Sequence, residues 1–561
     1  TTEYSENQKL LSFDSSKLSQ ALINVADVKS GLSGVEVIFP NINGEMERFL
    51  VWESSNFEPG LQAKYPEIRA FAGKSVDNPG STIRFSFSPY GVQTMVFRPD
   101  TGSEFIEPYT KDNSVYVLFD SQTRIVGQLP FSCGTQDVAL SQELSGSIAS
   151  QNRASNQVYK TMRLALSCTG EYGAYFGGVS QAIAAMNATM TRCNGVFEKD
   201  FGVRMQIIAN TDLVIYTNAS TDPYSAASGM SSWNSQLQST LTSVIGEANY
   251  DVGHLFGASG GGGNAGCIGC VCVNGSKGSG ITSPADGIPQ GDNFDIDYVA
   301  HELGHQFGAN HTWTHGGNEG TGVQVEPGSG STIMGYAGIC GSDDIQPHSD
   351  DYYHTRSLES MTGTGVTACA TNTPSNNALP TLSPRANTYI IPYRTAFELT
   401  ATGTDTDNDP LTYCWEEYDL GPAGAPSTPS GNAPLFRSQA PLLSPTRIFP
   451  KINYIISNNA NPLGEKLPTY ARSIKFRLTV RDNKAGGGGV TYGNTPLTLT
   501  VVNTTTPFLV TNPNVLLTWP ALSQQNVTWD VSGTDQAPIS ATNVDILLST
   551  DGGFTYPLTL A

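Results

Sequence analysis

Three histidines and a glutamate within one short stretch constrain the local fold most strongly. The stretch runs from His301 to His311 and reads HELGHQFGANH. His301 and His305 are four positions apart, so on an α-helix they lie one turn apart on the same face and can reach one metal ion. Gly308 lets the chain leave the helix with a positive φ, and the turn predicts that His311 returns as a third ligand.

This ligand set indicates the kind of metal site. Three protein ligands on zinc leave the fourth position to water, which is typical of a catalytic site and not of a structural one. Glu302 follows the first ligand, where its carboxylate can accept a proton from a water activated by the metal. The alternative is a helix with surface histidines beside a solvated glutamate, but this spacing rarely arises by chance in a chain with 7 histidines.

The flanking residues predict a helix before the motif and a tight turn after it. Asp295 is a candidate N-cap, and apolar residues recur at helical spacing from Ile296 to Phe307. Met334 follows in the segment STIMGYAGIC, where it can form a floor under the imidazoles, although alone it would be read as a core methionine. Tyr336 is expected to point its phenol at the metal or at a developing oxyanion.

These motifs resemble those of the metzincin clan of zinc endopeptidases. The segment from about Val158 to Thr371 is most similar to the reprolysin (adamalysin) branch, in the form found in secreted bacterial proteins. Residues 250–256 (YDVGHLF) resemble the strand that precedes the active-site helix in that branch, and residues 331–340 resemble its Met-turn. The resemblance implies a twisted mixed sheet with two long helices and a substrate cleft between two lobes.

Two positions, Thr312 and Tyr336, depart from the reprolysin pattern. Adamalysins carry Asp directly after the third histidine, whereas this chain has Thr312, followed by Trp313. Thr312 and Tyr336 are closer to the residues of pappalysins and astacins. In astacin-like members the tyrosine of the Met-turn is a swinging metal ligand, a role that the resemblance implies for Tyr336. The sequence therefore resembles the metzincin clan as a whole more closely than any single branch of it.

The resemblance implies a zinc-dependent endopeptidase that acts on proteins or peptides. Glu302 is expected to be the general base and then to pass its proton to the leaving amine. Residues 337–353 are expected to line the specificity pocket. Two other functions remain open, namely a non-catalytic adhesin or binding protein with an inert or structural zinc site, and a zinc enzyme that hydrolyses a non-peptide bond.

Composition favours a secreted, multidomain protein. A chain of 561 residues is too long for one hydrophobic core, and its net charge of −20 disfavours nucleic acid and anionic membranes as partners. Only 14% of the residues are charged and no apolar run is long enough to span a bilayer. The chain begins without a signal peptide, so export implies that the signal was removed or left out. We expect an extracellular, bacterial protein and favour a monomer.

The 9 cysteines favour disulfides formed in an oxidising compartment. Most of them fall in the predicted catalytic domain, and their spacing does not reveal the pairing. Cys267, Cys270 and Cys272 could instead form a second zinc knuckle, although no matching CxxC pair follows them.

Residues 1–145 form a separate block that resembles the β-rich propeptide of bacterial reprolysin-like proteases. It contains alternating, strand-like runs at residues 34–39, 47–52, 82–87 and 114–119. Residues 146–157 are interpreted as an exposed linker and activation segment. We expect cleavage between about Ser141 and Lys160, for example after Arg153.

Cys133 is the one cysteine of the N-terminal block. A cysteine followed by glycine near the end of a propeptide resembles the cysteine switch of matrix metalloproteases and adamalysins, in which a thiolate on zinc keeps the enzyme inactive. The rest of that switch motif is absent. Cys133 is therefore a candidate inhibitory zinc ligand in a zymogen, and the alternatives are a disulfide with the catalytic domain or a buried thiol.

The remaining chain is predicted to be β-rich. After a catalytic domain of residues 158–371, residues 380–503 read as an immunoglobulin-like or cadherin-like β-sandwich with a buried Cys414 thiol, and residues 504–561 as a second, incomplete module. Asp405, Asp407 and Asp409 could bind calcium or form an acidic surface turn. The predicted architecture is thus a β-rich prodomain, an α/β metzincin domain and C-terminal β-sandwich modules.

Overall fold

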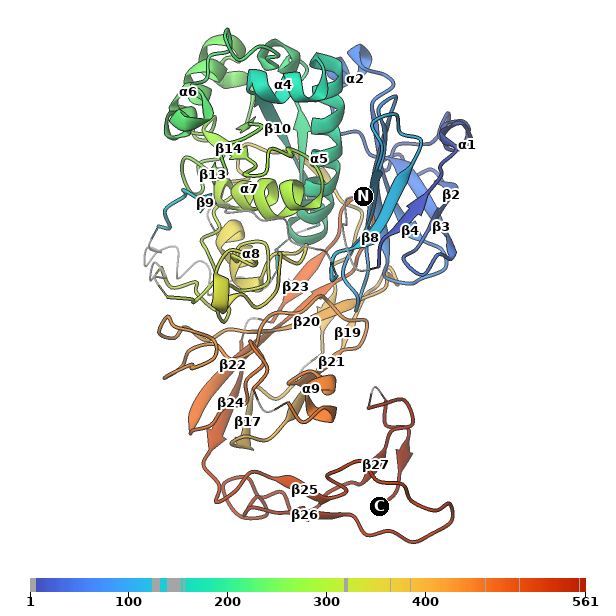
Figure 1. Ribbon diagram of the computed structural model, residues 1–561, viewed down its shortest axis with the longest axis vertical. Coiled ribbons are helices and arrows are strands. Elements are labelled where there is room, and N and C mark those ends of the chain that lie inside the picture. The colour runs from blue at the N-terminus through green and yellow to red at the C-terminus, as the bar shows by residue number, and fades with distance from the viewer. Residues whose placement is uncertain are drawn as a thin grey trace.

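The computed structural model describes residues 7–123, 132–138, 153–154, 157–316, 321–363, 365–383, 385–459, 461–493, 495–553 and 555–561. The N-terminal sheet and the helix-rich part lie side by side at one end of the molecule, and the C-terminal β-rich part extends from them along the long axis (Figure 1). Most of the predicted linker at residues 146–157 lies outside the described residues. Within the described ranges, no helix combines the length and the apolar character needed to cross a bilayer.

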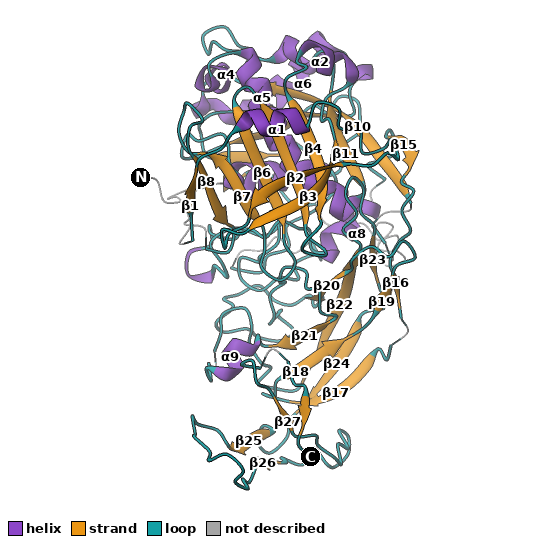
Figure 2. Cartoon of the chain, turned by 90° about the vertical axis from the view of Figure 1, so that its right-hand side faces the viewer, coloured by secondary structure: helices purple, strands orange, loops and turns teal. Residues whose placement is uncertain are grey.

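Residues 7–123 form an eight-stranded antiparallel sheet, which confirms the β-rich N-terminal region. Its elements are β1 (Lys9–Leu11), α1 (Ser15–Ala21), β2 (Val35–Pro40), β3 (Met46–Glu53), α2 (Pro59–Lys64), β4 (Arg69–Ser75), β5 (Thr82–Ser88), β6 (Gly91–Phe97), β7 (Glu104–Pro108) and β8 (Tyr116–Asp120). The strand order is β1-β8-β7-β6-β5-β4-β3-β2, and α1 crosses the outer face (Figure 2).

Alternation along these strands gives the sheet two apolar faces. Tyr116 and Leu118 of β8 belong to the core under α1, whereas Val117 and Phe119 join the core of the predicted catalytic domain, residues 158–371. The N-terminal sheet therefore shares a core with its neighbour.

The catalytic domain contains the expected mixed sheet. Its strands are β9 (Ser132–Cys133), β10 (Val158–Cys168), β11 (Val203–Ile207), β12 (Val252–Phe256), β13 (Gly262–Asn264), β14 (Gly280–Ser283) and β15 (Thr371–Pro374). The order is β11-β10-β12-β14-β13-β9, with β15 beside β10. β10, β11, β12 and β14 are parallel, β13 runs antiparallel to β14, and β9 of the N-terminal block pairs with the outer side of β13.

Helical elements cover this sheet. They are α4 (Gly170–Phe176), α5 (Val179–Phe201), η1 (Thr211–Val214), η2 (Ala227–Ser232), α6 (Trp233–Thr240), η3 (Leu241–Ile245), η4 (Glu247–Asn249), η5 (Asn293–Ala300), α7 (His301–Gln306), η6 (Gly341–Asp343) and α8 (Thr355–Gly363). α5 lies between the catalytic sheet and the N-terminal sheet and is buried along almost its whole length (Figure 1). The second long helix is made of a π-helical stretch, η5, that continues directly into α7.

The N-cap expected at Asp295 was wrong. The helix begins earlier, at Asn293, and the Asp295 side chain is fully buried within it. Its Oδ2 lies 2.9 Å from Nη1 of Arg192 on α5, and the same guanidinium contacts Glu107 of the N-terminal sheet at 2.7 Å. Asp295 therefore forms an ion pair with a residue far away in the sequence and does not cap the helix. The apolar residues predicted at helical spacing are buried, as expected.

Residues 388–502 form a five-stranded sheet and a small neighbouring sheet around a common aromatic core. The elements of the C-terminal part are β16 (Thr381–Leu382), β17 (Thr388–Pro392), β18 (Phe397–Thr400), β19 (Gly403–Thr404), β20 (Thr412–Glu417), β21 (Thr446–Phe449), α9 (Ile452–Ile456), β22 (Arg472–Arg481), β23 (Val490–Tyr492), β24 (Leu497–Val502), β25 (Leu509–Asn512), β26 (Thr528–Asp530), β27 (Leu547–Leu548) and β28 (Leu558–Thr559). The larger sheet has the order β17-β24-β22-β20, with β23 on β22, and β18 pairs with β21. An immunoglobulin-like or cadherin-like identity stays a prediction.

The last segment, residues 504–561, buries little apolar surface. It holds two short two-stranded ladders, β25–β26 and β27–β28. Its large apolar side chains are exposed, Leu516 and Leu522 among them, and no hydrophobic cluster of the described residues includes a residue after Val501.

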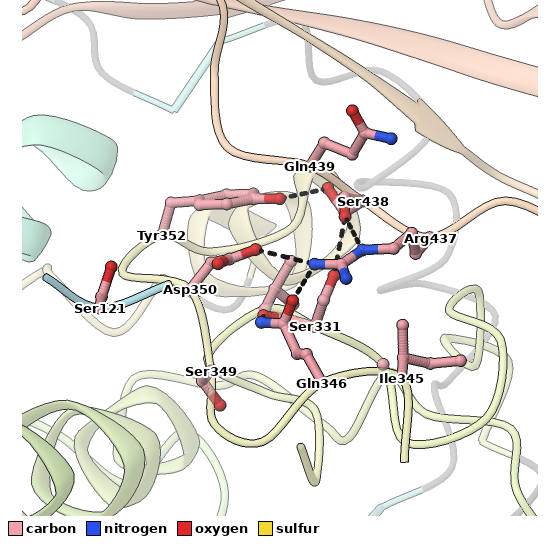
Figure 3. A network of polar contacts seen from close by, with 12 residues as sticks. Ser121, Ser331, Ile345, Gln346, Ser349, Asp350, Tyr352, Arg437, Ser438 and Gln439 are labelled. Atoms are coloured by element: carbon pink, nitrogen blue, oxygen red, sulfur yellow. Dashed lines mark hydrogen bonds and ion pairs between the residues drawn. The ribbon is translucent and has the colours of Figure 1, made fainter. Parts of the chain in front are cut away.

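A polar network joins the catalytic domain to the C-terminal module (Figure 3). Arg437, in the connection between β20 and β21, donates to Gln346 and lies 3.4 Å from Asp350. The Tyr352 hydroxyl donates to Ser438 Oγ over 2.7 Å, and Ser331 Oγ donates to the Ser438 carbonyl over 2.9 Å. The loop predicted to line the specificity pocket is thus fastened to the following module.

Two disulfides settle part of the cysteine pattern. Cys267 pairs with Cys270, and Cys272 pairs with Cys369. The zinc knuckle considered for the first three cysteines was wrong, because their sulfurs are joined in disulfides. Cys414 is a buried free thiol, as expected.

Candidate active site

The helix and turn predicted for the histidine motif are present. α7 carries His301, Glu302 and His305, and its last turn closes with a hydrogen bond from Ala309 N to the Gly304 carbonyl. Gly308 follows with a φ of +103°, a conformation that side chains resist. The chain then reverses and brings His311 back beside the helix.

The three imidazoles converge on one point. Their Nε2 atoms lie 3.2 Å apart for His301 and His305, 3.1 Å for His305 and His311, and 3.3 Å for His301 and His311. The Nδ1 atoms of His301 and His305 each lie 2.7 Å from a backbone carbonyl, of Ile333 and Ala309 respectively. Those carbonyls only accept, so the proton sits on Nδ1 and the Nε2 lone pair faces the common point.

This arrangement fits a zinc ion. Burial, together with the neighbouring imidazole of His311, lowers the pKa of His301 to about 3 and that of His305 well below its ordinary value. Both rings are therefore neutral, the form that binds metal. Converging lone pairs repel one another unless a cation lies between them, and three imidazoles with a further open position are a typical catalytic zinc ligand set.

Met334 lies under the site, as predicted. It is fully buried, and the Thr312 backbone N–H donates to its carbonyl over 3.1 Å. Gly304, between the two helix ligands, leaves the space that the Met334 sulfur needs. A Cβ on Gly304 would come within 2.6 Å of that sulfur. The helix and the turn after it are therefore closely packed.

Glu302 is completely buried beside the ligands. Burial raises the pKa of its carboxyl to about 8, although hydrogen bonds from Cys133 and Thr135 oppose the shift. Strand β13 passes directly over it, and a Cβ on Gly263 would lie 2.1 Å from Glu302 Oε1. The Glu302 carboxylate is thus enclosed by the strand and the ligand helix.

Tyr336 lies at the same centre. Its ring is 4.6 Å from that of His311 and 5.0 Å from that of Trp313, measured between centroids. Burial, and next the nearby Cys133 and Glu302, raise the pKa of its phenol far above the ordinary value. The phenol is therefore protonated and can act as a hydrogen-bond donor.

Cys133 also reaches the histidines. β9 pairs in parallel with β13, opposite Gly262 and Gly263. The Cys133 sulfur lies 3.7 Å from His305 Nε2. The four candidate ligand atoms, of Cys133 and the three histidines, all lie within 4.8 Å of one another. Cys133 forms no disulfide, so the disulfide alternative was wrong.

The residues after Cys133 contribute contacts that were not predicted. Thr135 Oγ1 donates to Glu302 Oε2 over 3.0 Å and accepts from the Ala265 N–H over 2.8 Å. Asp137 Oδ1 accepts from the His311 backbone N–H over 3.0 Å, and Val138 exchanges two hydrogen bonds with the Asn310 side chain. We call residues 132–138 the blocking segment, because they cover the candidate ligands and Glu302.

The acidic turn at Asp405, Asp407 and Asp409 gains no support as a calcium site. The three carboxylates do cluster. Lys484 Nζ, however, lies 3.1 Å from Asp407 and 3.6 Å from Asp409. An ammonium group already balances part of the charge, which agrees with the alternative of a surface turn.

Convergent imidazoles with an adjacent buried glutamate define a metal-dependent hydrolase site. Residues 158–362 match the family model described as metallopeptidase family M12B, reprolysin-like, so this part of the chain is similar to the reprolysin-like metzincins, a class of zinc metallopeptidases that act on proteins or peptides. No curated protein matches the chain.

Proposed function

We propose that the protein is a secreted zinc-dependent endopeptidase and that the blocking segment holds it as a zymogen. The observation that carries the proposal is the convergence of three Nε2 atoms beside the buried Glu302. The match to a peptidase family and the two disulfides, which are typical of oxidising compartments, support it. An inert binding protein has no need of a base beside an open metal position.

The roles of the side chains follow from their positions. His301, His305 and His311 would hold zinc, which when bound supplies a Lewis acid for the water and the scissile carbonyl. Glu302 accepts the proton of the attacking water and delivers it to the leaving amine nitrogen. The protonated Tyr336 phenol donates a hydrogen bond to the developing oxyanion.

Latency follows from two contacts of the blocking segment. The Cys133 sulfur lies where a fourth ligand would bind, and Thr135 occupies the carboxylate oxygen that would receive the water's proton. β9 also covers the free edge of β13, where an extended substrate would add as a strand. Cleavage in the linker, followed by withdrawal of this segment, would open all three positions.

The test compares wild-type protein and Glu302→Ala after cleavage of the linker. Wild type is expected to cleave casein or gelatin and to lose this activity with a zinc chelator. Glu302→Ala is expected to retain one zinc per chain and to lose peptide hydrolysis, because ligation does not involve the glutamate. Near-normal proteolysis by zinc-loaded Glu302→Ala would refute the mechanism, and a zinc-loaded, cleaved wild type that hydrolyses no peptide would favour the adhesin alternative.

A further inference from the structure

Glu326 is a buried carboxylate outside the ligand set. Its side chain is 1% exposed. Oε2 accepts hydrogen bonds from the hydroxyls of Thr312 and Thr332, each over 2.6 Å. Oε1 accepts from the backbone N–H groups of Ser331 and Thr332, over 3.0 and 3.2 Å, and from the Ser331 hydroxyl over 3.3 Å.

All these donors are neutral. Within the described ranges, Glu326 forms no ion pair with lysine, arginine or histidine. Burying an unpaired carboxylate is costly unless hydrogen bonds replace its hydration. Hydrogen-bond donors converge on both carboxylate oxygens of Glu326 and offset this cost. The pocket therefore fits a side chain with two acceptor oxygens.

The carboxylate connects the two segments that flank the metal centre. Thr312 directly follows the third ligand, and Ser331 and Thr332 directly precede the turn that contains Met334. The backbone N–H groups of Val325 and Glu326 both donate to the Thr312 carbonyl over 2.9 Å, and the Thr314 hydroxyl donates to the Glu326 carbonyl. Glu326 is therefore fixed at both its backbone and its side chain.

Thr312 stands where adamalysins carry a carboxylate. Its hydroxyl cannot accept from two N–H groups and two further hydroxyls as a carboxylate can. Glu326, from a separate part of the chain, brings a carboxylate to that hydroxyl. The departure at Thr312 is thus accompanied by an acidic residue in direct contact with it.

We propose that Glu326 is a positioning residue that fixes His311 relative to the Met334 turn. The inference rests on the zinc site of the proposed function. Without the carboxylate, the segment that holds the third ligand loses its side-chain connection to the turn, and the ligand geometry relaxes. Glu326 touches neither substrate nor metal.

The test measures the metal site directly in the full-length protein. We compare wild type with Glu326→Gln by the rate of zinc release to a chelator, and by the visible absorption spectrum after replacement of zinc with cobalt. Glutamine keeps the shape, but its NH₂ group must face either the two backbone N–H groups or the two threonine hydroxyls. We expect zinc affinity to fall about 10–100-fold, as for other groups that orient metal ligands, and the cobalt spectrum to change.

The matched control is Glu416→Gln in the C-terminal module. Glu416 is also fully buried and accepts hydrogen bonds from the Thr479 hydroxyl and the Thr355 N–H, and the His354 imidazole lies 3.8 Å from its other carboxylate oxygen. This variant is expected to leave zinc release and the cobalt spectrum unchanged. If Glu326→Gln fails to fold, Thr312→Val removes one donor with little change in shape and is expected to shift both measurements in the same direction.

A folded Glu326→Gln protein with wild-type zinc release and an unchanged cobalt spectrum would overturn the proposal. In activated protein, the variant should lower kcat with little change in KM, because substrate contacts remain. If cleaved wild type holds zinc but hydrolyses no peptide, the proposed function fails, whereas the comparison of zinc release still decides the role of Glu326.

Discussion

At the scale of single residues, two side chains of the blocking segment contact different groups of the site. Cys133 faces the three histidines and Thr135 faces Glu302. They are two residues apart on an extended chain, so their side chains project toward the same face. The blocking segment thereby contacts both the candidate zinc ligands and Glu302.

We predict that Cys133→Ser raises the peptidase activity of the uncut chain. Losing the sulfur removes a ligand contact, and a rise of about tenfold would correspond to about 1.4 kcal/mol. Thr135→Val should give a smaller rise, because only one hydrogen bond to Glu302 is lost. A fluorogenic peptide assay before linker cleavage measures both. Ser132→Ala, at an exposed position of β9, is the control, and unchanged activity of Cys133→Ser would argue against the switch.

At the scale of elements, strand β13 joins the blocking segment to the rest of the catalytic sheet. It pairs with β14 on one side and with β9 on the other. Gly263 is the point of closest approach to Glu302. β13 therefore needs a glycine at position 263, because the Glu302 carboxylate lies directly beneath it.

We predict that Gly263→Ala lowers kcat of the activated enzyme at least about tenfold, because a Cβ 2.1 Å from Glu302 Oε1 must displace the base. Zinc content should persist, since the ligands lie on other elements. Gly424→Ala is the control, because a Cβ there meets no atom within 4 Å. Wild-type kcat in folded Gly263→Ala would show that the strand accommodates the methyl group without moving Glu302.

The same scale shows what sequence reasoning could reach. The ligands and Glu302 were predictable because helical spacing and a glycine turn fix them locally, and Met334 was predictable from the segment STIMGYAGIC in which it stands. Thr135 and Glu326 were not, because their contacts depend on how distant segments are brought together and neither lies in a recognisable motif. Asp295 was misread for the same reason, since its partner Arg192 comes from another helix.

At the scale of the whole molecule, the three parts are connected through buried charge as well as apolar contact. Arg481 of β22 and Asp200 of α5 form a fully buried ion pair at 2.7 Å, and Arg481 also donates to the Tyr353 carbonyl. Val490 and Tyr492 of β23 belong to the core of the catalytic domain. The first C-terminal module is therefore a structural part of the catalytic unit.

We predict that Arg481→Met destabilises the protein by about 3–5 kcal/mol, because Asp200 is left buried without its partner. The double variant Asp200→Asn/Arg481→Met should lose less, since no charge remains. Chemical denaturation followed by tryptophan fluorescence measures the difference. Lys64→Ala, which breaks an exposed pair with Asp212, should cost at most about 1 kcal/mol. Equal losses for the single and double variants would contradict this account.

The core that the N-terminal sheet shares with α5 has a consequence for activation. Phe97, Phe105 and Phe119 of that sheet pack into the catalytic core, and Arg84 pairs with the buried Glu198 of α5. A cut in the linker severs one covalent connection and leaves these contacts intact. If the linker is cut as proposed, the protein would run as two bands on a denaturing gel and as one particle in native solution, because the N-terminal sheet stays bound through these contacts.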